Sequence, residues 1–202
     1  MTLSGRFFIT LLVVLHAAVG HALTGDEAIQ RFQERMNSIG TMSGTISWTD
    51  AQSQTLTGSF KFMAPGRVYV KFSAPSGRII SSNGKRLWVF DSSSNVCGVQ
   101  DLDKSGSGGI AALVNGYLAI LASQGPSGYT VKLKNSDKHY SDITIVLDAS
   151  FLLKKAVLMT KDGNGYSVTL SGVRTGEGMA PGLFDFSVPP NAQVVKNPLD
   201  VK

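Results

Sequence analysis

Apolar residues near the start of the chain recur every three or four positions, as they do on one face of a helix. The residues that share this face are Ile29, Phe32, Met36 and Ile39. Thr24 and Glu27 stand three residues apart just before it, an arrangement that caps the first turn of a helix through reciprocal hydrogen bonds. Gly40 follows the last apolar residue and ends the helix. The sequence therefore predicts a helix over residues 24–39.

Beyond residue 40 the period changes to two, because apolar and polar side chains alternate. Such alternation is typical of antiparallel strands with one sheltered face and one wet face. The runs that we interpret as strands cover residues 42–49, 56–62, 67–72, 79–80, 87–90, 95–102, 129–134, 142–147, 152–160, 165–172 and 184–186. Asn83-Gly84 and Asp162-Gly163 lie between consecutive runs and predict tight hairpin turns. The tail from residue 191 is expected to be loosely ordered.

One segment between the two halves of this pattern, residues 105–131, contains no charged residue. Its first part, residues 105–109, consists of serine and glycine alone, a composition typical of a flexible hinge. The apolar residues that follow predict a helix that ends near Gly125-Pro126. A helix so poor in charge has to lie against another apolar surface, so we expect it to cover the sheet as a lid. The residues expected to form this lid are Leu113, Tyr117, Leu118 and Leu121.

These elements fit an α+β domain that is mostly β, with one sheet of about ten or eleven strands. In one interpretation, the helices cover the sheltered face completely and form an ordinary two-layer core. In the other, the sheltered face carries more bulky side chains than a few helices can cover, and the hinged helix opens over an apolar pocket. The second interpretation predicts a protein that binds lipid.

The first 22 residues have the features of an export signal. Arg6 precedes an apolar run over residues 7–15 that is too short to span a membrane, and Gly20-His21-Ala22 places small residues where a signal peptidase cleaves. We expect cleavage after Ala22, which leaves residues 23–202 as a single soluble domain. Leu23 follows this site in place of the cysteine that a lipid anchor requires.

Composition and charge argue against several classes of function. Hydrophobic residues make up 43% of the chain, charged residues only 16%, and the net charge of +5 is spread without a basic cluster, so we expect no nucleic-acid binding. Cys97 is the only cysteine and is expected to be buried and inert. His139 is the only histidine after residue 22, and no catalytic triad or metal-ligand spacing includes it. We therefore expect no enzyme activity, no metal and no cofactor.

The region between residues 58 and 91 contains the motifs of a known family. The segments that carry the resemblance are Gly58-Ser59-Phe60, Pro65-Gly66-Arg67-Val68, Pro75 and Ile79-Ile80-Ser81-Ser82-Asn83-Gly84-Lys85-Arg86-Leu87-Trp88-Val89-Phe90-Asp91. A weaker match follows at Asp162-Gly163 and at Phe184-Asp185-Phe186. In these segments the chain resembles the LolA family of periplasmic lipoprotein carriers.

This resemblance implies an incomplete, half-open antiparallel β-barrel whose concave apolar face is covered by helices and accepts acyl chains. It implies a periplasmic carrier that takes lipoproteins from an ATP-driven release complex in the inner membrane to a receptor in the outer membrane, where such a receptor exists. We expect the carrier to be a monomer. The residues that the resemblance assigns to the lipid-binding cavity are Phe60, Phe62, Val68, Val70, Phe72 and Trp88.

The sequence departs from the family pattern just before Pro65. Family carriers often have an arginine at this position, which holds the lid closed, whereas this chain has Ala64. Either Arg67 acts as the latch, or apolar contacts alone hold the lid. Two other functions stay open on the same fold: a regulatory module that senses lipid, and a general shuttle for lipids or glycolipids.

Overall fold

The computed structural model describes residues 23–102 and 114–196 of the 202-residue chain. The expected signal sequence and the serine-glycine hinge lie outside these residues. Helix α1 (Gly25–Ser38) confirms the helix predicted at the start of the chain. The backbone N–H of Glu27 donates to Oγ1 of Thr24 (3.2 Å), and the backbone N–H of Thr24 donates to Oε2 of Glu27 (2.8 Å), so the predicted capping box is present.

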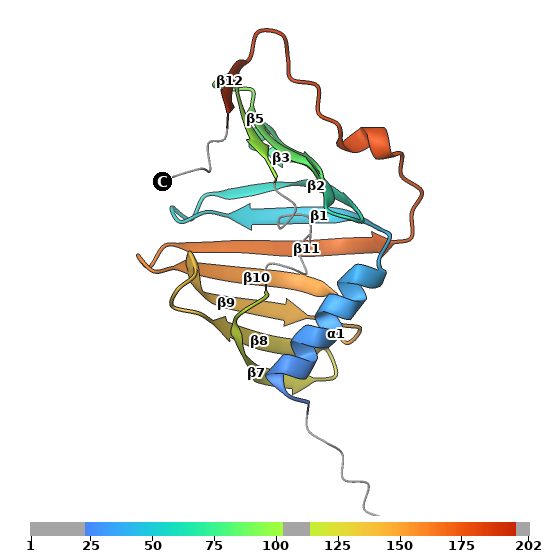
Figure 1. Ribbon diagram of the computed structural model, residues 1–202, viewed down its shortest axis with the longest axis vertical. Helices are drawn as coiled ribbons and strands as arrows, with labels where there is room; N and C mark the ends of the chain where they lie inside the picture. The colour runs from blue at the N-terminus through green and yellow to red at the C-terminus, as the bar shows by residue number, and fades with distance from the viewer. Residues whose placement is uncertain (1–22, 103–113, 197–202) are drawn as a thin grey trace, which may run out of the picture.

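Twelve strands form one sheet, whose neighbours run in the order β12-β6-β5-β4-β3-β2-β1-β11-β10-β9-β8-β7 (Figure 1). The strands are β1 (Thr41–Thr49), β2 (Thr55–Met63), β3 (Arg67–Ala74), β4 (Ser76–Asn83), β5 (Arg86–Asp91), β6 (Val96–Asp101), β7 (Leu118–Gly125), β8 (Gly128–Lys134), β9 (Tyr140–Leu147), β10 (Leu153–Thr160), β11 (Gly165–Thr175) and β12 (Gln193–Lys196). The sheet is strongly curved, and β7 and β12 remain as its two edges. This architecture confirms the mostly β, half-open antiparallel fold.

Two runs of consecutive hairpins, β1 to β6 and β7 to β11, meet where β1 pairs with β11. The two predicted turns are present: Gly84 (φ +86°) lies between β4 and β5, and Gly163 (φ +80°) lies between β10 and β11. Both glycines adopt the left-handed backbone that glycine tolerates best. At the first turn the side-chain oxygen of Asn83 also accepts hydrogen bonds from the backbone N–H groups of Lys85 (3.0 Å) and Arg86 (2.9 Å). These local interactions set the register of the β4–β5 hairpin.

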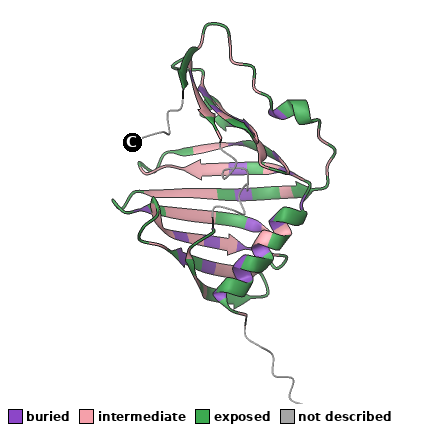
Figure 2. Ribbon diagram, in the orientation of Figure 1, coloured by how far each residue is buried: buried purple, intermediate pink, exposed green. Residues whose placement is uncertain are grey.

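The two faces of the sheet have different cores. We call the face against which α1 packs the inner face; it carries a large cluster that includes Phe32 and Met36 of the helix and apolar residues from β1 to β3 and β8 to β11. The opposite, outer face carries a smaller cluster of Trp88, Phe90 and Cys97. Figure 2 shows that α1 turns its buried residues toward the sheet and its exposed residues away from it. Cys97 is fully buried, and burial raises the pKa of its thiol, as expected for an inert cysteine.

The prediction of a lid helix after the hinge is wrong from residue 118 onward, because a strand begins there. Leu118 and Leu121 belong to the edge strand β7, which pairs with β8, and Tyr117 immediately precedes this strand. Ala119 and Leu121 pack on the inner core with Tyr117, whereas Leu118 points away and is 65% exposed. Burial at the start of this segment therefore alternates with the period of two that is typical of a strand. Leu113 lies outside the described residues.

The C-terminal segment also differs from its prediction. Residues 181–184 form a short 3-10 helix, η2 (Pro181–Phe184), and not the expected strand at 184–186. The tail expected to be loosely ordered instead forms β12, which pairs in parallel with β6. Phe186, Val188 and Ala192 of this segment cover the outer cluster, so burial of apolar surface accounts for its order.

Among the described residues, no helix is both long and apolar enough to cross a membrane.

Candidate functional site: the open end of the inner face

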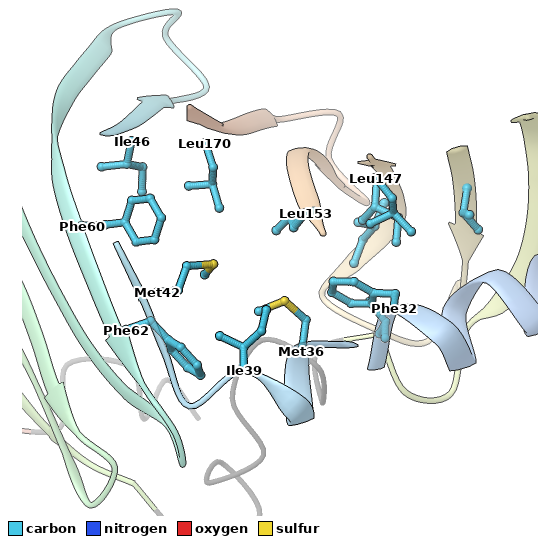
Figure 3. Close-up of a cluster of buried hydrophobic side chains, with 14 of the residues drawn as sticks. Phe32, Met36, Ile39, Met42, Ile46, Phe60, Phe62, Leu147, Leu153 and Leu170 are labelled. Atoms are coloured by element: carbon cyan, nitrogen blue, oxygen red, sulfur yellow. The ribbon is translucent and has the colours of Figure 1, made fainter. Parts of the chain in front are cut away.

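The inner face has two ends that differ in how far their side chains are buried. At one end, the closed end, Met36 of α1 and Ile39, which directly follows the helix, meet Met42 and Phe62 from the sheet, and all four are at most 5% exposed. Figure 3 shows these four side chains pointing toward one another between the helix and β2. The protein's own side chains are close-packed here and fill this end of the inner face.

The other end, the open end, remains partly accessible. β1 and β2 reach it with the pair Trp48 and Leu56, six residues along β1 from the pair Met42 and Phe62. Trp48 and Leu56 are only half-buried, and Val89 on β5 is 46% exposed. In Figure 2 the ends of β1 and β11 nearest these residues have intermediate exposure. The helix therefore covers only part of the inner face.

A pocket of about 280 Å³ lies at the open end, on the inner face of β1 to β5. Its lining includes Trp48, Leu56, Phe72, Arg78, Ile80, Val89 and Asp91. The register places Ile80 opposite both Val70 and Val89, so the pocket wall continues the row of inner-face side chains. A dry cavity of about 150 Å³ already holds a molecule of benzene, so this pocket has room for a segment of an acyl chain.

Aromatic rings extend the open end across the second half of the sheet. The ring centroid of Trp48 lies 6.3 Å from that of Tyr166, which lies 6.2 Å from that of Tyr140. The hydroxyl of Tyr117 donates to the backbone oxygen of Tyr140 (2.9 Å). Burial raises the pKa of both Tyr117 and Tyr140, so the hydroxyls of these two residues stay protonated. Rings of this kind present an apolar body and a polar tip, which suits the boundary between an apolar pocket and water.

One ion pair borders the pocket. Nε of Arg78 donates to Oδ2 of Asp91 (3.0 Å), and the carboxylate also accepts from the backbone N–H (2.9 Å) and the hydroxyl (2.6 Å) of Ser93. These hydrogen bonds from Ser93, followed by that of Arg78, lower the pKa of Asp91 to about 2. Asp91 is therefore charged at any physiological pH and fixes one edge of the guanidinium group.

Replacing Ser93 with alanine should raise the pKa of Asp91 from about 2 toward 3.8, because its largest stabilising hydrogen bond is lost. Since the folded-state pKa is lowered, the carboxylate stabilises the fold above pH 3.8, and this contribution disappears as the pH falls to about 2. A carbon-detected NMR titration of the carboxyl group measures the change. Ser94→Ala is the matched control, since that hydroxyl contacts only the backbone oxygen of Asp91; equal shifts in the two variants would contradict the assignment.

Most of the residues expected in the cavity lie on the inner face. Val70 and Phe72 are buried there on β3, together with Phe60 and Phe62 on β2, while Val68 is half-buried. Phe72 lines the open-end pocket, whereas Phe62 belongs to the closed end. The expected set is therefore spread along the whole inner face, and only one member lines the pocket itself.

Trp88 does not lie on the inner face. It pairs with Ser81 and Val99, one residue out of step with the inner-face pair Ile80 and Val89, and it packs in the outer cluster. The expectation that Trp88 lines the lipid cavity is wrong, because successive side chains of a strand point to opposite faces.

Arg67 also points away from the cavity. It begins β3 and alternates with the inner-face residues Val68 and Val70, so its side chain leaves from the outer face. This position does not fit a latch that acts on the inner side.

The sequence interpretation missed the residues that distinguish the open end. Leu56, Arg78, Ile80, Val89 and Asp91 were not assigned to the site, although all of them line the pocket. A signal was present in Arg78, since a charged residue two positions from Ile80 stands on the sheltered face of its strand. Nothing local to Val89 distinguishes it from an ordinary surface valine.

Comparison with known proteins gives a consistent assignment. The family described as "Outer membrane lipoprotein carrier protein LolA" matches residues 44–187, more than half of the chain. An outer-membrane lipoprotein carrier protein from Legionella pneumophila (strain Lens) is 24% identical, over 95% of this chain and 98% of its own. A protein of the same description from Neisseria meningitidis serogroup C is also 24% identical, over 92% of this chain and 95% of its own.

Solved structures support the fold. An uncharacterized conserved protein from Thermus thermophilus aligns with a TM-score of 0.57 and 12% sequence identity, covering 85% of this chain and 98% of its own. This similarity concerns the backbone alone. Together with the match over residues 44–187, the curved sheet with its apolar inner face shows that the chain belongs to the LolA family of non-enzymatic lipoprotein carriers.

Proposed function

We propose that this protein shelters the acyl chains of lipoproteins on its inner face and carries them from the inner to the outer membrane. The observation that carries the proposal is the apolar pocket at the open end, whose wall includes the 46% exposed Val89. An acyl chain needs such shelter, because each CH₂ group is worth about 0.8 kcal/mol and a palmitoyl chain on the order of 12 kcal/mol. An acylated protein cannot cross an aqueous gap at a useful rate without it.

Carriers of the LolA family work in the periplasm, and we propose the same location here, reached by cleavage after Ala22. The partners that follow are an acylated lipoprotein as cargo, an ATP-driven release complex in the inner membrane, and a receptor in the outer membrane. Residues 23–202 are proposed to act as one domain and as a monomer. Family membership and the pocket on the inner face support this scheme.

Replacing Val89 with glutamate tests the site. A carboxylate in the pocket wall has to lose water when an acyl chain binds, so we expect the affinity for a synthetic peptide with a triacylated N-terminal cysteine to fall by more than about tenfold. The fold should survive, because Val89 is partly exposed before binding. Fluorescence titration measures the affinity, and circular dichroism checks the fold.

Val194→Glu is the matched control. This valine is 47% exposed, almost the same as Val89, but it lies on β12 beside the outer-face pocket of Trp88 and Val99. We expect normal binding in this variant. Normal binding by Val89→Glu, or an equal loss in both variants, would show that the inner face is not the acyl site.

Mass spectrometry of the mature protein isolated from its native envelope identifies the cargo. Co-purified acylated protein is the result expected for a lipoprotein carrier. Free phospholipid or glycolipid alone would replace this function with a general lipid shuttle on the same site. A protein that neither holds lipid nor transfers it between vesicles would contradict both functions and leave a sensing role.

A further inference from the structure

The guanidinium group of Arg78 is fixed at the border of the pocket with donors to spare. Its Nε atom donates a hydrogen bond to Asp91, and no other described residue accepts a hydrogen bond from the guanidinium group. The two terminal nitrogens of a guanidinium group carry most of its N–H donors. Asp91 is itself held by two hydrogen bonds from Ser93, so it orients the Nε edge of the guanidinium group.

The two ends of the inner face offer different surroundings to an acyl chain. At the closed end, Met36, Ile39, Met42 and Phe62 are all apolar and buried. The charged residues among the described lining of the pocket are Arg78 and Asp91, and both stand at the open end. An amphiphile that binds here with its tail toward the closed end keeps its head beside the guanidinium group, whereas the reverse direction buries the head among apolar side chains.

We propose that cargo binds in one direction, with its tail toward the closed end and the hydrogen-bond-accepting oxygens of its head on Arg78. This inference rests on the proposed function and names the chemistry that the site recognises: carboxylate, phosphate or ester oxygens next to an acyl chain. An arginine suits this role, because its planar group donates two parallel hydrogen bonds to such oxygens. Asp91 positions Arg78 and disfavours cationic heads.

Arg78→Gln tests the head group with three probes that share one tail: palmitate, methyl palmitate and hexadecylamine. In wild-type protein we expect palmitate to bind most tightly. In the variant, the affinity for palmitate should fall by about tenfold or more, since a charged hydrogen bond is lost, and that for methyl palmitate by a few-fold. The affinity for hexadecylamine should stay constant or rise. The relative loss for the acid and the ester tells which kind of oxygen the site prefers.

Arg86→Gln is the matched control. Arg86 forms the same kind of pair, with its Nε 2.7 Å from Oδ1 of Asp101, and its side chain is 50% exposed, as is that of Arg78. It lies beside Trp88 in the outer-face pocket, so none of the three affinities should change. Equal losses for all three probes in Arg78→Gln, or no loss for any, would overturn the proposal.

The direction of binding can be measured separately with the two tryptophans of the chain. Trp88→Phe leaves Trp48, at the open end, as the only fluorophore of this type. Stearate that carries a nitroxide near its head should quench Trp48 more strongly than stearate labelled near the end of its tail. Stronger quenching by the tail label would reverse the proposed direction.

These outcomes separate this inference from the function on which it rests. Loss of acyl binding in Val89→Glu together with an unselective Arg78→Gln variant would leave the carrier function in place and remove the role of Arg78. Normal binding in Val89→Glu would remove the acyl site itself.

Discussion

Replacing Phe32 with alanine is expected to lower the free energy of unfolding by about 3–5 kcal/mol. Phe32 is 1% exposed and lies in the apolar stripe with which α1 packs on the inner core. The helix makes its main contacts with β7 and β8, so the cavity left by the ring would loosen the only described α-helix from the sheet. Urea denaturation followed by circular dichroism measures the difference.

Gln30→Ala is the control for the Phe32 variant. Gln30 is exposed on the other side of α1, where its amide donates to Oε1 of Glu34 (2.9 Å), a helical pair worth about 0.2–0.5 kcal/mol. The two substitutions should therefore differ several-fold in effect. A Phe32→Ala variant that loses less than about 1 kcal/mol would mean that α1 does not depend on this face for its position.

The sequence predicted the elements whose signals are local. Thr24 and Glu27 begin α1 through contacts within one turn, and Gly84 and Gly163 close hairpins through their own backbone angles. The alternation of apolar residues then assigned nearly every strand of the two meanders, because a half-exposed strand has to keep one period along its length.

The elements that were predicted incorrectly owe their conformation to contacts with residues far away in the sequence. The run from Leu118 to Leu121 is apolar at every position, so its period cannot tell a helix from a strand. Its strand conformation comes from pairing with β8, and α1 covers only its inner side. Similarly, β12 exists because β6 offers a free edge, which no pattern within residues 193–196 reveals.

The face of Trp88 follows from the pairing of β4 with β5 and not from the motif. In the β4–β5 hairpin Ser82 pairs with Leu87, so even-numbered residues of β4 share a face with odd-numbered residues of β5. Val70 is opposite Ile80, which places Val89 on the inner face and Trp88 on the outer one. Whenever an even number of residues separates Ser82 from its partner on β5, Val89 lies on the inner face and Trp88 on the outer one. Motif similarity emphasised Trp88, whereas the pairing rule selects Val89.

Two different segments of the chain cover the two faces of the sheet. Helix α1 covers part of the inner face and leaves the open end accessible, while the C-terminal segment covers the outer cluster, with the ring centroid of Phe186 5.7 Å from that of Phe90. A substitution in the C-terminal segment should therefore change the stability of the sheet without changing the affinity for acyl chains.

Phe184→Ala provides the sharpest test of this separation, with an expected loss of about 3–5 kcal/mol in the free energy of unfolding. Phe184 is fully buried where η2 packs on β3 and β4, and its backbone oxygen accepts a hydrogen bond from the buried hydroxyl of Ser81 (2.9 Å). The cavity left by the ring would weaken the anchor of the whole segment that ends in β12. Urea denaturation measures the loss, and hydrogen exchange shows whether β12 is released first.

Leu183→Ala is the matched control, because this neighbour in η2 is 36% exposed and its truncation should cost less than about 1 kcal/mol. In conditions where Phe184→Ala remains folded, binding of the triacylated peptide should be unchanged, since the inner face is on the other side of the sheet. Equal losses of stability in the two variants would mean that Phe184 does not anchor the segment. A drop in acyl affinity in Phe184→Ala would instead mean that the two faces are coupled, and that the outer cover helps to shape the pocket at Val89.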